Sequence, residues 1–400
     1  MTSRCIAIGT VTLALSVLLN LYARQAPPRD RLTSKPTVAH SGAAAKKNLT
    51  LAGAILVPGN PIRFDISWVD EPRGRYYLAE SGNAAVDVFD AENDLFIGRI
   101  SGFHGIPATD DPCGRIEGMG PNGVMVTPDN HLWADDAHGT VKVFDLTTAK
   151  PPFKDVMPVA TISTGAVCRA DELGFDPKDH VVVVGNPEEH PPFAAIISSD
   201  PPYALLAKIP FPDATGFEQP LWDAGLKGGR MLVTVPGKDR AAEVAVLDLS
   251  KPKSPVVETT YSTPGCGSGL ALGPAQHLLV GCGGGRPLIL IDAATGKTIT
   301  TIEGTHGADE VWYNPGDNHF YAATGNSAPP NLSVIDAVTG KLISNLPAGP
   351  GAHSVTAYGR NNHVFAPIAS PTQTIPEDAC NVLFGLPEKQ GCIAVYAPEK

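Results

Sequence analysis

The sequence predicts an all-β fold, a seven-bladed β-propeller with four-stranded antiparallel blades, from three observations. Residues 287–302 and 331–346 nearly copy each other as an apolar strand, a D-A-x-T-G-K turn and a second strand, which is the pattern of a β-hairpin. No stretch shows sustained 3.6-residue periodicity, so we expect little helix. Further turn signals recur at intervals of 41 to 58 residues, the period of one propeller blade. These turns lie near Asp70, Pro128, Pro177, Ala224, Pro274, Pro315 and Gly359.

The predicted blades follow one another along residues 49–398. Weaker copies of the hairpin occur at 86–94, 141–148 and 244–250, and an insertion at about 102–118 explains the longest interval. The last copy, at Cys392–Pro398, matches the third strand of a blade. Leu49–Pro58 resembles the missing fourth strand. We therefore expect this N-terminal strand to complete the last blade and close the ring, which removes an exposed sheet edge.

The N-terminal segment indicates export. Residues 5–23 carry no charge, are rich in Leu, Val, Ile and Ala, and follow Arg4, as in a signal peptide. The stretch is also just long enough to cross a bilayer as an uncleaved anchor. We expect residues 1–23 to be a signal peptide, or alternatively a membrane anchor, and residues 24–48 to be a linker. The propeller is then periplasmic or extracellular.

Composition and motifs exclude several partners. The net charge is −11 and no basic patch is present, so a nucleic-acid partner is not expected. The chain has no C-x-x-C, which excludes haem c attachment. Gly296-Lys297-Thr298 lacks the earlier glycine of a P-loop and lies in a hairpin turn, so no nucleotide cofactor is expected. We expect membrane contact only through the N-terminal segment, if it stays uncleaved.

Six cysteines follow Cys5, an even number that fits disulfides in an oxidising compartment. Cys266 and Cys282 are equidistant from Pro274, inside the turn that joins two apolar runs, so they should face each other across a hairpin. Cys380 and Cys392 bracket a loop and should pair, which leaves Cys113 to pair with Cys168. The alternative is free, buried thiols. The expected disulfides are Cys266–Cys282, Cys380–Cys392 and Cys113–Cys168.

Polar residues gather where the innermost strand of each predicted blade begins. In a propeller these strands line the axial channel, and their starts surround one mouth of it. Two blades share the tripeptide A-D-E there, at 170–172 and 308–310. Aligning the blades on their turns places the following candidate metal ligands at this mouth: Asp65, Asn122, Asp171, Glu172, Glu218, His306, Asp309, Glu310 and His353.

These residue types suit a divalent cation. Carboxylate and amide oxygens are the ligands that Ca²⁺ prefers, whereas His306 and His353 would favour a transition metal. The alternative is that the polar residues bind ordered channel water or cap neighbouring backbone groups. The four tryptophans occur in predicted strands, and we expect them to pack between blades. They are Trp68, Trp133, Trp222 and Trp312.

The D-A-x-T-G-K copies resemble the YVTN family of seven-bladed bacterial β-propellers, and the copy that runs through Leu346-Pro347-Ala348-Gly349 is especially similar. Residues 121–133 resemble the first strands of NHL-repeat and gluconolactonase-type propellers. The gluconolactonase resemblance implies a metal-binding role for Asn122, although that family has six blades. Because related propellers include binding proteins, lactonases, lyases and redox-enzyme domains, the resemblance predicts architecture more sharply than chemistry.

The first functional hypothesis is an exported propeller that binds a small ligand, a metal or a protein partner at its carboxylate-rich mouth, without turnover. The second is a metal-assisted hydrolase or lactonase, in which the cation polarises a carbonyl and Asp or Glu acts as general base. The third is a protein-interaction scaffold that uses the loops at 102–118 and 370–392. Bound metal together with lactone or ester hydrolysis would distinguish the second hypothesis.

Overall fold

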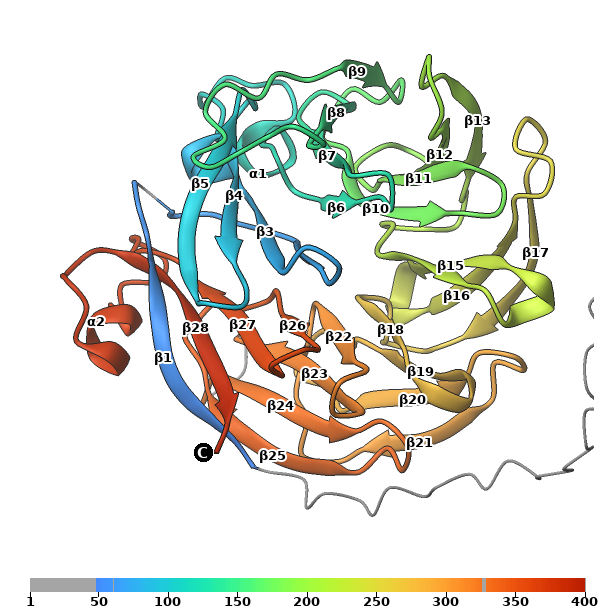
Figure 1. Ribbon diagram of the computed structural model, residues 1–400. Coiled ribbons are helices and arrows are strands. Elements are labelled where there is room, and N and C mark those ends of the chain that lie inside the picture. The colour runs from blue at the N-terminus through green and yellow to red at the C-terminus, as the bar shows by residue number, and fades with distance from the viewer. Residues whose placement is uncertain (1–47, 60, 326–328, 400) are drawn as a thin grey trace, which may run out of the picture. The chain divides into compact units, whose positions relative to one another are not determined.

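The described residues of the computed structural model, 48–59, 61–325 and 329–399, form seven four-stranded antiparallel sheets arranged as the blades of a ring (Figure 1). This confirms the predicted seven-bladed β-propeller. The predicted signal peptide or anchor and nearly all of the linker lie outside the described residues. Within each blade the strands run outward from the centre in chain order, except in the last blade.

The seven sheets have the following strands. Blade 1 contains β2 (Ser67–Asp70), β3 (Arg75–Glu80), β4 (Ala85–Asp90) and β5 (Leu95–Ser101). Blade 2 contains β6 (Val124–Val126), β7 (His131–Asp136), β8 (Thr140–Asp145) and β9 (Ala160–Ser163). Blade 3 contains β10 (Asp171–Asp176), β11 (Val181–Asn186), β12 (Phe193–Ser198) and β13 (Leu205–Pro210). Blade 4 contains β14 (Pro220–Asp223), β15 (Arg230–Pro236), β16 (Ala242–Asp248) and β17 (Val256–Ser262).

Blade 5 contains β18 (Leu270–Leu272), β19 (His277–Val280), β20 (Leu288–Asp292) and β21 (Thr298–Ile302). Blade 6 contains β22 (Val311–Asn314), β23 (His319–Thr324), β24 (Asn331–Asp336) and β25 (Leu342–Pro347). Blade 7 contains β26 (Thr356–Tyr358), β27 (His363–Ile368), β28 (Gly391–Pro398) and β1 (Leu49–Val57). Every turn predicted from the sequence falls between the first and second strands of its blade.

The D-A-x-T-G-K motif forms the turn between the third and fourth strands of blades 5 and 6. Its aspartate closes the turn: Asp292 Oδ1 accepts a hydrogen bond from the Ala294 N–H at 2.8 Å, and Asp336 Oδ1 accepts one from the Thr339 N–H at 2.9 Å. Its glycine supplies the left-handed backbone, with φ of 71° at Gly296 and 66° at Gly340. The motif therefore repeats because each turn needs the same acceptor and the same backbone freedom.

The N-terminal strand closes the ring as predicted. Figure 1 shows β1, in blue, alongside β28, in red, near the two ends of the described chain. The pairing is antiparallel and runs from Leu49 opposite Pro398 to Val57 opposite Gly391. Ile55 and Val57 are buried between this strand and blade 1. The last blade is thus completed by a strand from the other end of the sequence.

The core lies between the blades. Every residue of β11 and of β23 is buried, because the middle strands have a neighbouring blade on both faces. The outermost strands bury one side at most, and in β17 every residue except the half-buried Tyr261 is exposed. Burial of apolar side chains on both faces explains the continuous apolar runs of the second strands.

Among the described residues, helices are short and confined to connections, as the sequence predicts. The α-helices are α1 (Gly114–Glu117) and α2 (Ala379–Phe384). Asp378 caps α2 by accepting a hydrogen bond from the Asn381 N–H, and Gly385 ends it with a φ of 66°. Four single-turn 3₁₀ helices lie in loops: η1 (Ser81–Asn83), η2 (Leu226–Gly228), η3 (Lys238–Arg240) and η4 (Pro274–Gln276).

All three predicted cysteine pairs are bonded, Cys113–Cys168, Cys266–Cys282 and Cys380–Cys392. The register assumed for the second pair is nevertheless wrong by two residues. Equal spacing from the turn places Leu270 opposite Leu278, but the structure pairs Leu270 with Val280. The reason is η4, which lengthens the turn and shifts the pairing. The disulfide forms just before β18 begins, where the Cα atoms are 3.8 Å apart.

Candidate functional site

The starts of the inner strands converge at one mouth of the central channel. Hydrogen bonds between neighbouring inner segments hold them together: the Ile66 N–H donates to the Asn122 carbonyl at 2.9 Å, and the Glu310 N–H donates to the His353 carbonyl at 2.9 Å. Polar side chains at these positions are therefore brought close to one another, although they come from different blades.

Arg169 is the centre of an ion-pair network in the mouth. Its guanidinium lies 2.9 Å from Asp171, 3.4 Å from Asp65 and 3.5 Å from Glu188. His353 Nε2 approaches the other oxygen of Asp65 at 3.2 Å. The network joins blades 1, 3 and 7 and places positive charge among the predicted ligands.

Burial and the ion pairs of the network shift the pKa values of its members. Burial alone would raise the pKa of Asp65, but its hydrogen bond with His353 and the charge of Arg63 lower that pKa to about 2. Burial lowers the pKa of His353, yet Asp65 more than offsets this and raises it overall. Burial raises the pKa of Asp171 to about 7, against the opposing charge of Arg169. Asp65 is therefore a stabilised anion, whereas Asp171 resists ionisation.

Three further carboxyl groups, Glu172, Glu218 and Glu310, form what we call the glutamate cluster. Burial raises the pKa of each well above its usual value, and neighbouring carboxylates raise it further: Glu310 acts on Glu172, and Asp309 acts on Glu218 and Glu310. The side chain of Glu172 beside Glu218 partly offsets this rise in the pKa of Glu218. None of the three forms an ion pair with Arg or Lys among the described residues. The cluster thus holds carboxyl groups that lack a cation.

Glu172 has the most unusual environment of the cluster. Its backbone is left-handed, with φ of 57°, at a bulge that interrupts the pairing of β10 with β11 between Asp171 and Leu173. The residue is 3% exposed, and its Oε2 has no hydrogen-bond partner among the described residues. A strained, buried and partly unsatisfied carboxyl group is costly unless a ligand completes its interactions.

The central channel extends from this point. It encloses about 410 Å³ along the inner strands of six blades. Glu172 and Gln219 line its end beside the mouth, while Pro128 and Pro177, in the turns after β6 and β10, line its opposite end. Between these ends the lining is mostly aliphatic and aromatic. The mouth is therefore acidic, and the channel behind it is apolar.

All four tryptophans pack against cores between blades, as predicted, and three of them also line this channel, which the prediction did not include. Trp68, Trp222 and Trp312 are half-buried on the inner strands and face the cavity. Trp68 and Trp312 meet edge to face, with ring centroids 5.6 Å apart. Trp133, 1% exposed, lies fully inside a core between blades, away from the channel. The inner strands are so short that sequence alternation does not reveal which residues face the axis.

The remaining predicted residues separate into different environments. Asp309 lies close enough to the network and the cluster to affect both. Asn122 is fully buried, and its amide donates hydrogen bonds to the Met119 and Ala170 carbonyls. This fits the alternative that polar residues at the mouth cap neighbouring backbone groups. Its Oδ1 has no partner among the described residues. His306 is exposed on the loop after β21 and makes no hydrogen bond or ion pair with the other candidates in the described part of the chain.

Sequence reasoning did not identify three contributors to the mouth, Arg63, Asp135 and Glu188. Asp135 lies on β7, a second strand, and its Oδ1 accepts hydrogen bonds from the N–H groups of Asn122 and Gly123 at 3.1 and 2.8 Å. Burial and the charge of Asp171 raise the pKa of Asp135 well above its usual value. An alignment of inner-strand starts could not find residues that reach the mouth from other strands and loops.

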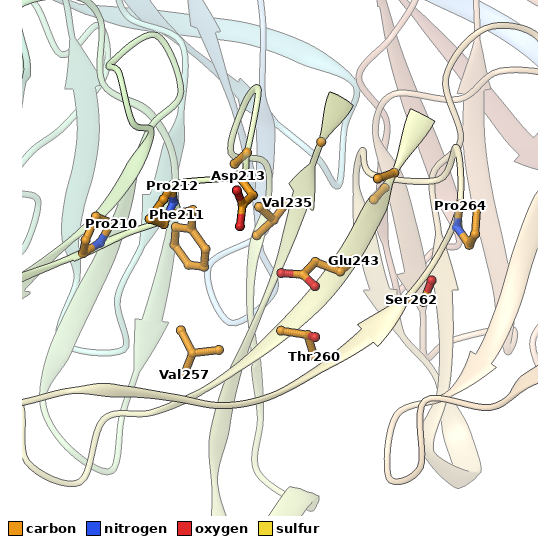
Figure 2. A pocket seen from close by; sticks show the side chains of 14 residues that line it. Pro210, Phe211, Pro212, Asp213, Val235, Glu243, Val257, Thr260, Ser262 and Pro264 are labelled. Atoms are coloured by element: carbon orange, nitrogen blue, oxygen red, sulfur yellow. The ribbon is translucent and has the colours of Figure 1, made fainter. Parts of the chain in front are cut away.

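A larger cavity, of about 620 Å³, is lined by none of the candidate residues of the mouth and lies between the segment after β13 and the outer strands of blade 4 (Figure 2). Figure 2 shows the carboxylates of Asp213 and Glu243 spread along it with Phe211 and Val257. Among the described residues that line it, none has a side-chain polar atom that is both buried and unpartnered. Size alone does not make this groove a site, and the mouth is the candidate site considered below.

Comparison with known proteins supports the fold alone. No family model matches the sequence, and no curated protein matches it. Among solved structures, a chain in a crystal structure of a mitotic checkpoint complex is similar with a TM-score of 0.61 and 12% identity, covering 96% of this chain and 100% of that chain. At this identity the likeness indicates a shared propeller fold and carries no function with it.

Two observations bear on location. The three disulfides indicate an oxidising compartment. Within the described residues, no helix has the length and apolar character needed to cross a membrane.

Proposed function

We propose that this protein is an exported, YVTN-like propeller that binds a cationic ligand at its acidic mouth, without turnover. The observation that carries the proposal is the buried carboxyl group of Glu172, which has one oxygen without a partner among the described residues and lines the end of the channel. Burial without a partner disfavours the ionised form, so a cation that binds there supplies the interaction that the fold lacks.

The surroundings of Glu172 favour an organic cation over a bare metal ion. Arg169 is already paired with Asp65 and Asp171, which leaves the glutamate cluster as the part of the mouth without a cationic partner among the described residues. A metal ion would use these carboxylates but not the apolar channel behind them. An amine with an apolar body would place its ammonium at Glu172 and its hydrocarbon against Trp222 and the other aromatic side chains of the channel. We therefore propose amphiphilic amines as the ligand class.

Tryptophan fluorescence provides a direct test, because three of the four tryptophans line the channel. Octylamine, octanol and octanoate have the same chain and different charge. We expect octylamine to bind most tightly and octanoate most weakly. Glu172→Gln should remove the preference for the amine while retaining octanol binding, whereas Trp312→Ala should weaken all three. Calorimetry would confirm the affinities.

Other outcomes identify the alternatives. Binding of octanoate as tight as that of octylamine would contradict the proposal. A rise in melting temperature with Ca²⁺ or Mn²⁺, without amine binding, would support the divalent cation predicted from the sequence. Metal-dependent hydrolysis of lactones or esters would support the hydrolase hypothesis. If no probe binds and no hydrolysis occurs, the scaffold hypothesis remains.

A further inference from the structure

Two histidines and an aspartate meet on the surface of blade 2, outside the mouth. His104 and Asp111 belong to the insertion between β5 and β6, and His138 lies in the turn between β7 and β8. One potential ligand atom from each residue lies within 4.8 Å of those of the other two. Asp111 Oδ2 is 3.7 Å from His138 Nε2, and the two imidazole rings are nearly perpendicular with centroids 4.7 Å apart.

Hydrogen bonds hold His104, Asp111 and the residue next to His138. The His104 N–H donates to Asp136 Oδ1 at 3.0 Å. Asp111 Oδ1 accepts a hydrogen bond from the Cys113 N–H at 2.9 Å, which leaves Oδ2 directed to the histidines. The Cys113–Cys168 disulfide ties this insertion to the segment before β10.

The same segment anchors the third residue. The N–H of Gly139, next to His138, donates to the Cys168 carbonyl at 2.5 Å. His138 itself adopts a left-handed conformation with φ of 54°. The loop segments that carry the three residues are therefore held together by a disulfide and by backbone hydrogen bonds.

We infer that His104, Asp111 and His138 bind a transition-metal ion of the Zn²⁺ class. Two imidazole nitrogens and one carboxylate oxygen are a ligand set that Zn²⁺ accepts, with water in the fourth position, and that Ca²⁺ and Mg²⁺ disfavour. Asp111 is largely buried while both histidines are accessible, with 8% of the Asp111 side chain and 43% of the His138 side chain exposed. The ion can therefore enter from solvent and find a charged ligand already in place.

This site does not depend on the proposed function. It contains none of the mouth residues, and its ligands are mainly imidazole nitrogens rather than carboxylates. Its test can therefore succeed or fail separately from amine binding in the channel.

Zinc titration of the chelator-treated full chain, followed by calorimetry, tests the site, and Co²⁺ supplies a spectroscopic readout of histidine ligation. We expect one high-affinity ion per chain. His138→Asn should weaken binding at least tenfold, and Asn tolerates the left-handed backbone at this position. His104→Gln provides a second, independent loss. Cys113→Ser should also weaken binding, because it frees the insertion that carries Asp111.

His180→Asn is the matched control. His180 is an exposed turn histidine with the same φ of 54° and a carboxylate neighbour, Asp200, at 3.4 Å, but it has no second histidine nearby among the described residues. This variant should bind zinc as the wild type does. The inference is overturned if wild-type protein binds no ion, or if His138→Asn and His104→Gln both bind as tightly as the His180→Asn control.

Discussion

Asp65 and Glu172 both come from the start of an inner strand, but their carboxyl groups lie in opposite electrostatic environments in the mouth. Asp65 is buried with His353, Arg63 and Arg169 around it, so folding stabilises its anion and its pKa falls to about 2. Glu172 is buried with other carboxyl groups around it, so folding disfavours its anion and its pKa rises. The same residue class therefore stabilises the fold at one position and opposes it at another.

This contrast predicts opposite effects for two neutral substitutions. Glu172→Gln combined with Glu310→Gln removes repulsion and keeps volume, so the melting temperature at pH 8 should rise by a few degrees. Asp65→Asn removes the partner of His353 and Arg169, and the melting temperature should fall by a similar amount. Differential scanning fluorimetry measures both. A fall in the double glutamate variant would mean that the cluster is stabilised as it stands.

Much of the architecture could be predicted at the scale of single elements, because its signals are local. The Asp and Gly of the D-A-x-T-G-K turn make bonds and backbone angles within the motif itself, so the sequence shows them directly. The register at Cys266 and the channel position of Trp312 could not be predicted in this way. The first depends on a 3₁₀ turn that leaves little pattern, and the second on which face of a four-residue strand meets the axis.

The candidate site could be predicted only where its residues occupy equivalent places in the repeat. Glu172 and Glu310 could be found because they occupy equivalent places in repeated elements. Arg63 and Asp135 could not, because they reach the mouth from a loop and from a second strand. Likewise, the proximity of His104 and His138 depends on an insertion whose path is set by a disulfide rather than by the repeat.

The closing strand gives a prediction for an element. Ile55 of β1 is 6% exposed and packs in the core with blade 1, whereas its neighbour Leu56 is 38% exposed. Ile55→Ala should therefore lower the free energy of unfolding by about 2–4 kcal/mol, and Leu56→Ala by less than about 1 kcal/mol. Deleting residues 49–58 should cost more than Ile55→Ala. Denaturant unfolding measures all three. Equal effects of the two alanine variants would show that β1 does not close the ring in solution.

At the scale of the whole molecule, burial raises the pKa of several carboxyl groups. Burial raises the pKa of Asp171 to about 7, of Asp87 to about 6 and of Glu80 to about 9. In each case the folded protein binds a proton that the unfolded chain releases at lower pH. Folding stability must therefore fall as pH rises from the unfolded value, near 4, through the raised values. The raised pKa of His353 acts in the same direction above its unfolded value, near 6.5.

Asp65 has the opposite effect on stability, but it does not act in the pH range above about 4. Asp65, with its pKa lowered to about 2, loses its stabilising contribution only when pH falls below its unfolded value of about 4. We therefore expect the melting temperature to be higher at pH 5.5 than at pH 8, the reverse of a protein held mainly by carboxylate ion pairs. The Glu172→Gln, Glu310→Gln double variant should show a smaller decline over the same interval, because two of the proton-binding groups are gone. Scanning calorimetry across pH 5–8 measures both slopes. A melting temperature that rises across this range would contradict the assignment of buried, proton-retaining carboxyl groups to the mouth.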